Sequence, residues 1–303
     1  MDLHRPWERE TLPSASTGPP PSARPCSLPW SSQLRPPSAS PVSPLGKDTL
    51  PGNSVETEKA DDTGTTDESD VSADRTIDVL VLCTGEAEEG EGSEEDILDA
   101  IDSGLEGMNK ALERSDIEGQ VTLAHAEKID FQETDDQGEA MTWARESDEV
   151  ADLCEEHSAD LISVVVSGQA GIAQFPIPTE DTDDMAFSVV GADWLRSDDA
   201  TGEAGVFAHE LGHNLGATHD WNSSPEPNPH HPYNKGHVTA NGLVDVMAYN
   251  NAASCDPDRQ RVPYYSNPDI EVQGEKFGAD DGDRPSHIKK LFDETTPIVA
   301  AYR

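Results

Sequence analysis

Three histidines and a glutamate between residues 209 and 219 have the spacing of a catalytic metal site. The segment reads H-E-L-G-H-N-L-G-A-T-H, which fits the pattern H-E-x-x-H-x-x-G-x-x-H. His209 and His213 stand at positions i and i+4, so their imidazoles share one face of a helix. Gly216 is predicted to turn the chain, because glycine adopts positive φ readily, and to return His219 as the third ligand. Three such ligands with an open fourth position are typical of one catalytic Zn²⁺.

The residue after the first ligand adds a proton acceptor to this pattern. Glu210 lies about 100° round the helix from His209, where its carboxylate can take a proton from a metal-bound water. The alternative, a solvated histidine pair on a helix surface, does not account for the longer spacing pattern. The arrangement therefore predicts metal-assisted hydrolysis with Glu210 as the general base.

A methionine-bearing segment follows the histidines. Residues 245–249, Asp-Val-Met-Ala-Tyr, resemble the Met-turn of the metzincin metalloproteases. In that family a methionine side chain forms an apolar floor beneath the zinc-binding histidines. The resemblance gives Met247 this structural role, and a flexible thioether is suited to such packing.

Other segments point to the reprolysin-like branch of the metzincins. Asp220 follows the third histidine, and H-x-x-G-x-x-H-D is similar to the ending found in adamalysin-type enzymes. Residues 261–274 resemble the closing segment of microbial reprolysin-like and pappalysin-like proteases, and the resemblance extends upstream to residues 77–84. Asp220 is also the candidate for orienting a ligand through a hydrogen bond.

Tyr249 departs from the animal adamalysin-type pattern, which usually has proline after the Met-turn. In astacin-like and serralysin-like metzincins, a tyrosine two residues after the methionine contacts the zinc or the reacting oxyanion. The resemblance therefore leaves two roles for Tyr249. It donates to developing negative charge, or it packs below the site with its hydroxyl in water.

The resemblance implies an α/β (α+β) fold. Its parts are a twisted mixed five-stranded sheet, a backing helix, an active-site helix and a small irregular C-terminal subdomain. Apolar and β-branched runs predict strands at residues 77–84, 121–126, 161–166, 171–175 and 186–190. Apolar periodicity predicts helices at 94–114, 139–157, about 203–215 and 285–293. The strand at 171–175 is expected at the sheet edge, where an extended peptide can pair with it.

Composition divides the chain into three parts. Residues 1–47 are rich in proline and serine and are predicted to be disordered, and residues 48–75 form an acidic linker. Residues 76–303 are the expected catalytic domain, with subdomains at 76–216 and 217–303.

The net charge of −41 limits the partners of the chain. Contacts with phosphate groups need basic residues, so nucleic acid is excluded as a partner. No apolar stretch is long enough to span a membrane, and no apolar signal-peptide region is visible near the N-terminus. A protein or peptide substrate is expected. The family implies an extracellular or cell-surface location, and the oligomeric state is left open.

Three other patterns are weaker. Asp280-Asp281-Gly282-Asp283 could bind Ca²⁺ but lacks the full EF-hand spacing, so a solvated turn is favoured. His230, His231 and His237 lie in a Pro/Asn-rich loop, where exposed histidines are the simpler account. Cys26 follows Arg-Pro, as in a cysteine switch that caps zinc in a latent protease, but its proline-rich surroundings favour disorder.

The sequence thus predicts a zinc metalloendopeptidase, a hydrolase of peptide bonds. One alternative is a zinc hydrolase acting on a non-protein substrate, which the same chemistry permits. The other is a non-catalytic binding module that keeps the fold, for which loss of the glutamate would be the usual mark. Glu210 is present.

The acidic composition also predicts a halophilic protein. Because 61 acidic residues face 20 basic ones, their repulsion acts over about 30 Å at 0.01 M salt and about 3 Å at 1 M. We expect activity and far-UV circular dichroism to collapse on dialysis to low salt and to return in molar KCl. Equal urea midpoints at about 0.05 M and about 2 M salt would contradict this expectation.

Overall fold

The computed structural model describes residues 75–169, 171–196, 205–249 and 259–303. The predicted disordered segment 1–47 and, apart from Arg75, the linker 48–75 lie outside the described residues, as does Cys26. None of the helices that are described is long and apolar enough to cross a membrane.

A five-stranded mixed sheet forms the centre of the described structure, as predicted. Its strands are β1 (Thr76–Thr84), β2 (Gln120–Ile129), β3 (Leu161–Val166), β4 (Gly171–Ala173) and β5 (Phe187–Gly191). They lie in the order β2-β1-β3-β5-β4. The first four in this order are parallel, and β4 is the antiparallel strand at the edge.

Each face of the sheet carries its own apolar core, because successive side chains of a strand point to opposite faces. On β1, Val79 and Val81 belong to the core that includes residues of α2 (Glu94–Arg114) and α5 (Val206–Asn214). Leu80 belongs to the core on the other face. That second core includes residues of α3 (Gln137–Glu146) and α4 (Asp148–His157). All residues of β3 are buried, as is typical of a parallel strand covered on both faces.

Among the helices that precede α5, the structure differs from the sequence prediction in two places. The single helix expected at 139–157 is two helices, because Ser147 is extended and its Oγ caps α4 by accepting from the N–H of Val150. The short helix α1 (Gly85–Glu91) was not predicted, and Thr84 caps it. The α2 bounds are those predicted, with Ser93 as the N-cap. Two short 3-10 turns occur at Asp183–Met185 and Ala192–Trp194.

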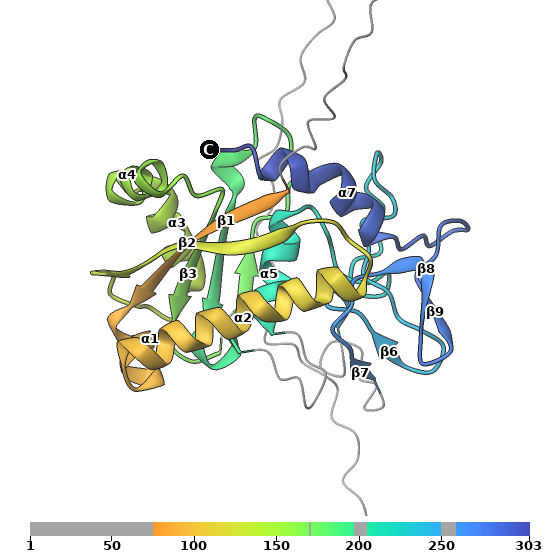
Figure 1. Cartoon of the computed structure of the whole chain (residues 1–303), viewed down its shortest axis with the longest axis horizontal. Coiled ribbons are helices and arrows are strands. Elements are labelled where there is room, and N and C mark those ends of the chain that lie inside the picture. The colour runs from red at the N-terminus through yellow and green to blue at the C-terminus, as the bar shows by residue number, and fades with distance from the viewer. Residues whose placement is uncertain (1–74, 170, 197–204, 250–258) are drawn as a thin grey trace, which may run out of the picture. The chain divides into compact units, whose positions relative to one another are not determined.

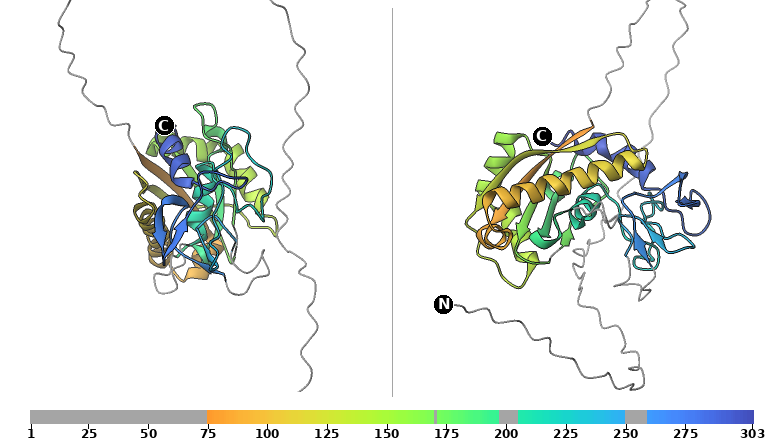
Figure 2. Two further views of the ribbon diagram at one scale, coloured as in Figure 1. Left: turned by 90° about the vertical axis from the view of Figure 1, so that its right-hand side faces the viewer. Right: turned by 60° about the horizontal axis from the view of Figure 1, so that its bottom comes forward.

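The C-terminal part has the small, irregular character expected of it. Short strands β6 (Leu243–Val244) and β7 (Gln260–Arg261) pair in parallel, and β8 (Asn267–Val272) and β9 (Glu275–Phe277) pair antiparallel. These blue strands gather at one side of the molecule in Figure 2. The last helix, α7 (Ile288–Val299), begins later and ends later than the predicted 285–293, and it continues past Pro297.

The active-site helix α5 is held by very close packing against α2. A Cβ atom added at Gly104 of α2 would lie 2.6 Å from Cδ1 of Phe207 and 2.7 Å from the carbonyl oxygen of Leu195. Only a glycine fits this approach. On the sheet side, the amide of Asn214 donates to the carbonyl oxygens of Gln174 and Phe187, next to the edge strand. Helix α5 is therefore fixed between α2 and the sheet edge.

Candidate active site

The three histidines of the motif lie together at the end of α5. Their nitrogen atoms lie within 4.8 Å of one another, and no other group of this kind occurs among the described residues. The chain turns back at Gly216, whose φ is 93°, so the left-handed turn expected there is present. An added Cβ at Gly216 would lie only 3.0 Å from Cδ of Pro178.

The nitrogen spacing fits a metal of the size of zinc. Nε2 of His213 and Nε2 of His219 are 3.0 Å apart. Two nitrogens bound tetrahedrally to zinc at about 2.0–2.1 Å would be about 3.3 Å apart. The donor set is all imidazole, which suits zinc and related transition metals.

Two of the imidazoles are oriented by backbone carbonyls. Nδ1 of His209 lies 2.8 Å from the oxygen of Val246, and Nδ1 of His213 lies 2.8 Å from the oxygen of Ala217. Each Nδ1–H donates there, which leaves Nε2 as the ligand atom. Burial lowers the pKa of His213 to about 4 and that of His209 well below its ordinary value. Neutral imidazoles are the form that binds a metal.

Met247 lies directly beneath the helix that carries the ligands. It is fully buried. An added Cβ at Gly212, between the two helical histidines, would lie 2.6 Å from Met247 Sδ and 3.5 Å from Cε1 of Tyr265. The hydroxyl of Tyr265 in turn donates to the oxygen of Ala208 at 2.9 Å. Met247 therefore packs against the segment of α5 that carries His209 and His213.

Sequence reasoning gave no role to Asp245, which fixes the shape of the Met-turn. Its Oδ1 accepts from the N–H groups of Met247 (3.0 Å) and Ala248 (2.8 Å), and its Oδ2 accepts from the N–H of Ser266 (3.1 Å). Burial raises the pKa of Asp245 to about 7, although the backbone hydrogen bonds oppose this shift. An acidic residue inside the apolar run 243–248 was the signal that could have identified it.

Asp220 contacts a different group from the one expected. Its carboxylate accepts from the N–H of Asn222 (3.0 Å), the hydroxyl of Ser223 (2.9 Å) and the N–H of Tyr249 (3.3 Å). No hydrogen bond to an imidazole is among these contacts. Asp220 thus links the loop after the third histidine to the end of the Met-turn.

Tyr249 lies beside the histidines. Its ring centroid is 4.2 Å from that of His219 and 6.2 Å from that of His209. Burial and the nearby Glu210 carboxylate raise the pKa of the phenol to about 12. The phenol therefore keeps its proton at neutral pH.

Glu210 is buried between α5 and the edge strand. The residue is 3% exposed. Burial raises its pKa to about 8, and the nearby Arg261 guanidinium opposes this rise. A Cβ added at Gly171 of β4 would lie 2.5 Å from Oε1 of Glu210. The backbone of the edge strand therefore passes against the carboxylate itself.

Comparison with known proteins finds a similar family. Residues 98–220 match the family model described as Metallo-peptidase family M12B Reprolysin-like. This part of the chain is thus similar to a reprolysin-like metallopeptidase domain, and the histidine triad lies within the matched segment. The match ends at Asp220, so it includes the histidine triad and Glu210 but not the Met-turn.

Curated relatives agree with this assignment. A peptidyl-Asp metalloendopeptidase of Pseudomonas aeruginosa is 25% identical over 222 residues, which are 65% of this chain and 35% of that protein. One of Stenotrophomonas maltophilia is 34% identical over 101 residues, which are 32% of this chain and 22% of that protein. The chain thus spans about a third or less of the length of these relatives.

A solved structure has a similar fold. The structure titled "Structure of a chaperone-substrate complex" superimposes with a TM-score of 0.59 at 17% identity. The superposition covers 76% of this chain and 39% of that chain. At this identity the likeness concerns the fold alone.

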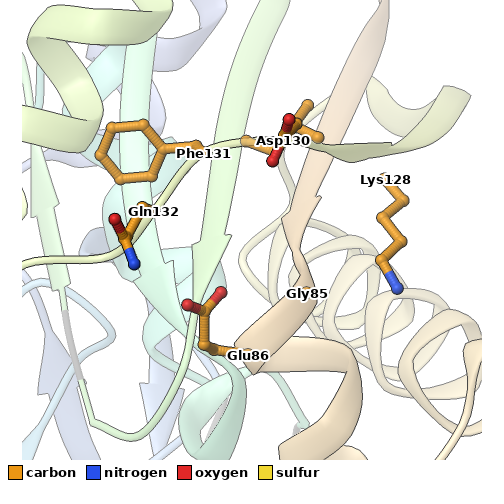
Figure 3. Close-up of a pocket in the computed structure, with 7 residues that line it drawn as sticks. Gly85, Glu86, Lys128, Asp130, Phe131 and Gln132 are labelled. Carbon is orange, nitrogen blue, oxygen red and sulfur yellow. The ribbon is translucent and has the colours of Figure 1, made fainter.

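The remaining candidates do not join the site. His231 faces Glu294, at 3.5 Å between Nε2 and Oε2, and His237 packs its ring against Phe277. Asp280, from the candidate calcium segment, contacts His287. A pocket of about 560 Å³ lies where β1 and β2 end, and it contains none of the site residues (Figure 3). It is lined by Gly85, Glu86, Lys128, Ile129, Asp130, Phe131 and Gln132.

Replacing Gly212 tests the contact between the Met-turn and the metallopeptidase helix. In Gly212→Ala, the new Cβ would lie 2.6 Å from Met247 Sδ, so α5 or the Met-turn must shift. We expect metal affinity, titrated with Zn²⁺ against a chelator, to fall by about tenfold or more.

Gly90→Ala is the matched control for this variant. Gly90 lies in α1, where an added Cβ meets nothing within 4 Å. The change should leave metal affinity unaltered and raise the free energy of unfolding by up to about 1 kcal/mol, the helix preference of alanine over glycine. Equal metal affinity in both variants would show that the Gly212–Met247 contact does not position the ligands.

Proposed function

We propose that this domain is a zinc-dependent endopeptidase. In this proposal His209, His213 and His219 bind one catalytic Zn²⁺, and Glu210 is the general base. The observation that carries the proposal is the position of the Glu210 carboxylate, which is buried on the helix that carries His209 and His213 and touches Gly171 of the edge strand. The family match and the metalloendopeptidase relatives support the same activity.

The chain's own groups account for the proton transfers that peptide hydrolysis needs. Bound zinc supplies a Lewis acid that polarises the scissile carbonyl and favours ionisation of water. Glu210 accepts the proton of the attacking water as oxygen bonds to the carbonyl carbon. It then delivers that proton to the amide nitrogen as the C–N bond breaks. The Tyr249 hydroxyl donates a hydrogen bond to the carbonyl oxygen as negative charge develops there.

The edge strand favours a peptide as the substrate. β4 pairs with β5 on one side, and it is the last strand of the sheet. An extended peptide that adds to its other side would pass beside Glu210, because Gly171 belongs to this strand. Phe175 follows β4. Among the described residues it is the large apolar side chain that is exposed to solvent, at 60%. Its ring centroid lies 5.9 Å from that of His213. It offers an apolar contact to such a peptide.

The relatives supply a substrate preference. Each of those given above is a peptidyl-Asp metalloendopeptidase. We extend this to the present domain and propose that it cleaves peptides beside aspartate. From the same family resemblance, we propose that the domain acts outside the cell or at the cell surface. From the acidic composition, we propose that the protein is adapted to high salt.

The rival functions are less well supported. A non-catalytic binding module has no use for a carboxylate buried at the metal ligands, where burial is costly for a charged group. A hydrolase of non-protein substrates has no use for a sheet edge that leads past the general base. Both rivals are outcomes of the experiments below.

Two variants separate the proton acceptor from the metal ligands. Glu210→Gln keeps the volume of the side chain and the three histidines, so we expect near-stoichiometric zinc with nearly all turnover lost. His213→Ala should lose zinc and turnover together, because one ligand is gone. Zinc is measured by mass spectrometry beside cleavage of an unstructured protein. Unchanged proteolysis by purified Glu210→Gln would exclude Glu210 as the base.

The contact between β4 and Glu210 gives an independent test. In Gly171→Ala, the methyl group would lie 2.5 Å from Oε1 of Glu210 and 2.8 Å from Cγ1 of Val206, so the carboxylate must move. A displaced base should lower kcat by about a hundredfold while zinc content stays at one ion per chain. Wild-type kcat in this variant would show that β4 does not position the base.

A further inference from the structure

Two arginines lie against the last residues of the Met-turn. Nη1 of Arg259 donates to the oxygen of Tyr249 at 3.1 Å, and Nη2 of Arg261 donates to the oxygen of Ala248 at 3.1 Å. The parallel pairing of Val244 with Arg261 between β6 and β7 holds this segment in place. Cations are scarce in this chain, with 20 basic residues against 61 acidic ones. Two of the few basic side chains of the chain therefore lie beside the candidate site.

Arg261 is the arginine whose charge reaches the site. Its guanidinium is bonded to the residue between Met247 and Tyr249, and the Tyr249 ring packs on His219. In agreement with this position, its positive charge adds to the burial that lowers the pKa of His209 and His219, and it opposes the burial that raises the pKa of Glu210 and Tyr249. Arg259 makes the same kind of bond to the neighbouring carbonyl oxygen of Tyr249.

Another cation near the histidines has a structural use. Lys235 is buried, and its Nζ donates to the carbonyl oxygens of Ser224 and Glu226 and to the hydroxyl of Ser224. These contacts close the loop that follows the third histidine. Arg261 is only half-buried, and its planar fork of N–H donors matches the geometry of a carboxylate.

We infer that Arg261 binds the carboxylate of an acidic substrate side chain next to the scissile bond. This inference rests on the proposed endopeptidase function and adds the residue that selects the substrate. A peptide that reaches the histidines and Glu210 comes within the field of Arg261. An aspartate at that point gains a charge-assisted hydrogen bond, whereas a lysine meets a like charge. The names of the relatives agree with this preference.

A purely structural role for Arg261 makes a different prediction. If the guanidinium only braced the Ala248 carbonyl, its loss would lower the turnover of every substrate by the same factor. If it binds the acidic side chain of the substrate, its loss lowers kcat/KM for acidic peptides and leaves kcat/KM for neutral peptides unchanged. The ratio of two peptides measured with one variant therefore separates the two roles.

The experiment uses three sets of peptides that are identical except for Asp, Asn or Lys beside the scissile bond, on one side or the other. kcat/KM is measured for the full chain with zinc and for R261Q, R261E and the matched control R259Q. We expect the Asp-to-Asn ratio to fall by about thirtyfold or more in R261Q and the preference in R261E to turn towards Lys. R259Q should keep the wild-type ratio, whatever its absolute rate.

The outcomes separate this inference from the function beneath it. A wild-type chain that binds zinc but cleaves none of the peptides overturns the proposed function. A wild-type chain that cleaves Asp and Asn peptides equally overturns the inference alone, as does R261Q with an unchanged ratio. If R261Q loses zinc or its circular dichroism spectrum, R261K replaces it. R261K keeps the charge but not the fork, so it should keep a weakened preference for Asp over Asn and still disfavour Lys.

Discussion

The contact between Gly212 and the sulfur of Met247 is the constraint on which the site depends. Any other residue at position 212 would place its Cβ only 2.6 Å from Met247 Sδ, which is too close for both atoms to fit. The Met-turn can therefore approach α5 closely enough for the Val246 carbonyl to accept from His209. Asp245 fixes the turn through three backbone N–H groups. A candidate metal ligand on α5 is thus oriented by a turn from the C-terminal part of the chain.

Close packing of α5 also sets the electrostatics of the site. Because α2, the sheet edge and the Met-turn surround the helix, three imidazoles and one carboxylate lie in a poorly solvated place. Burial is the first cause of the lowered pKa of each histidine and of the raised pKa of Glu210. Neutral imidazoles suit a metal cation, and Arg261 partly offsets the cost of the carboxylate.

Sequence patterns predicted elements well where a local signal was strong. The α2 bounds were correct because Ser93 caps the helix and apolar residues recur along one face. The region 139–157 was predicted as one helix because Ser147 interrupts the apolar period only slightly, yet its side chain starts a new helix. Bounds of α7 were shifted because its apolar face, including Phe292, packs on the main core, and tertiary packing outweighs the proline at 297.

The residues that could form the site were predictable from the sequence, because the spacing of His209, Glu210 and His213 on one helix is a local property. The turn at Gly216 and the edge strand were predictable for the same reason. The contacts of those residues depend on the tertiary packing. Asp220 binds the N–H of Tyr249, backbone carbonyls orient His209 and His213, and Gly171 meets Glu210. The position of Arg261 beside the site was not predicted for the same reason. A contact between distant segments depends on how the helices and the sheet pack, and no local sequence pattern contains that information.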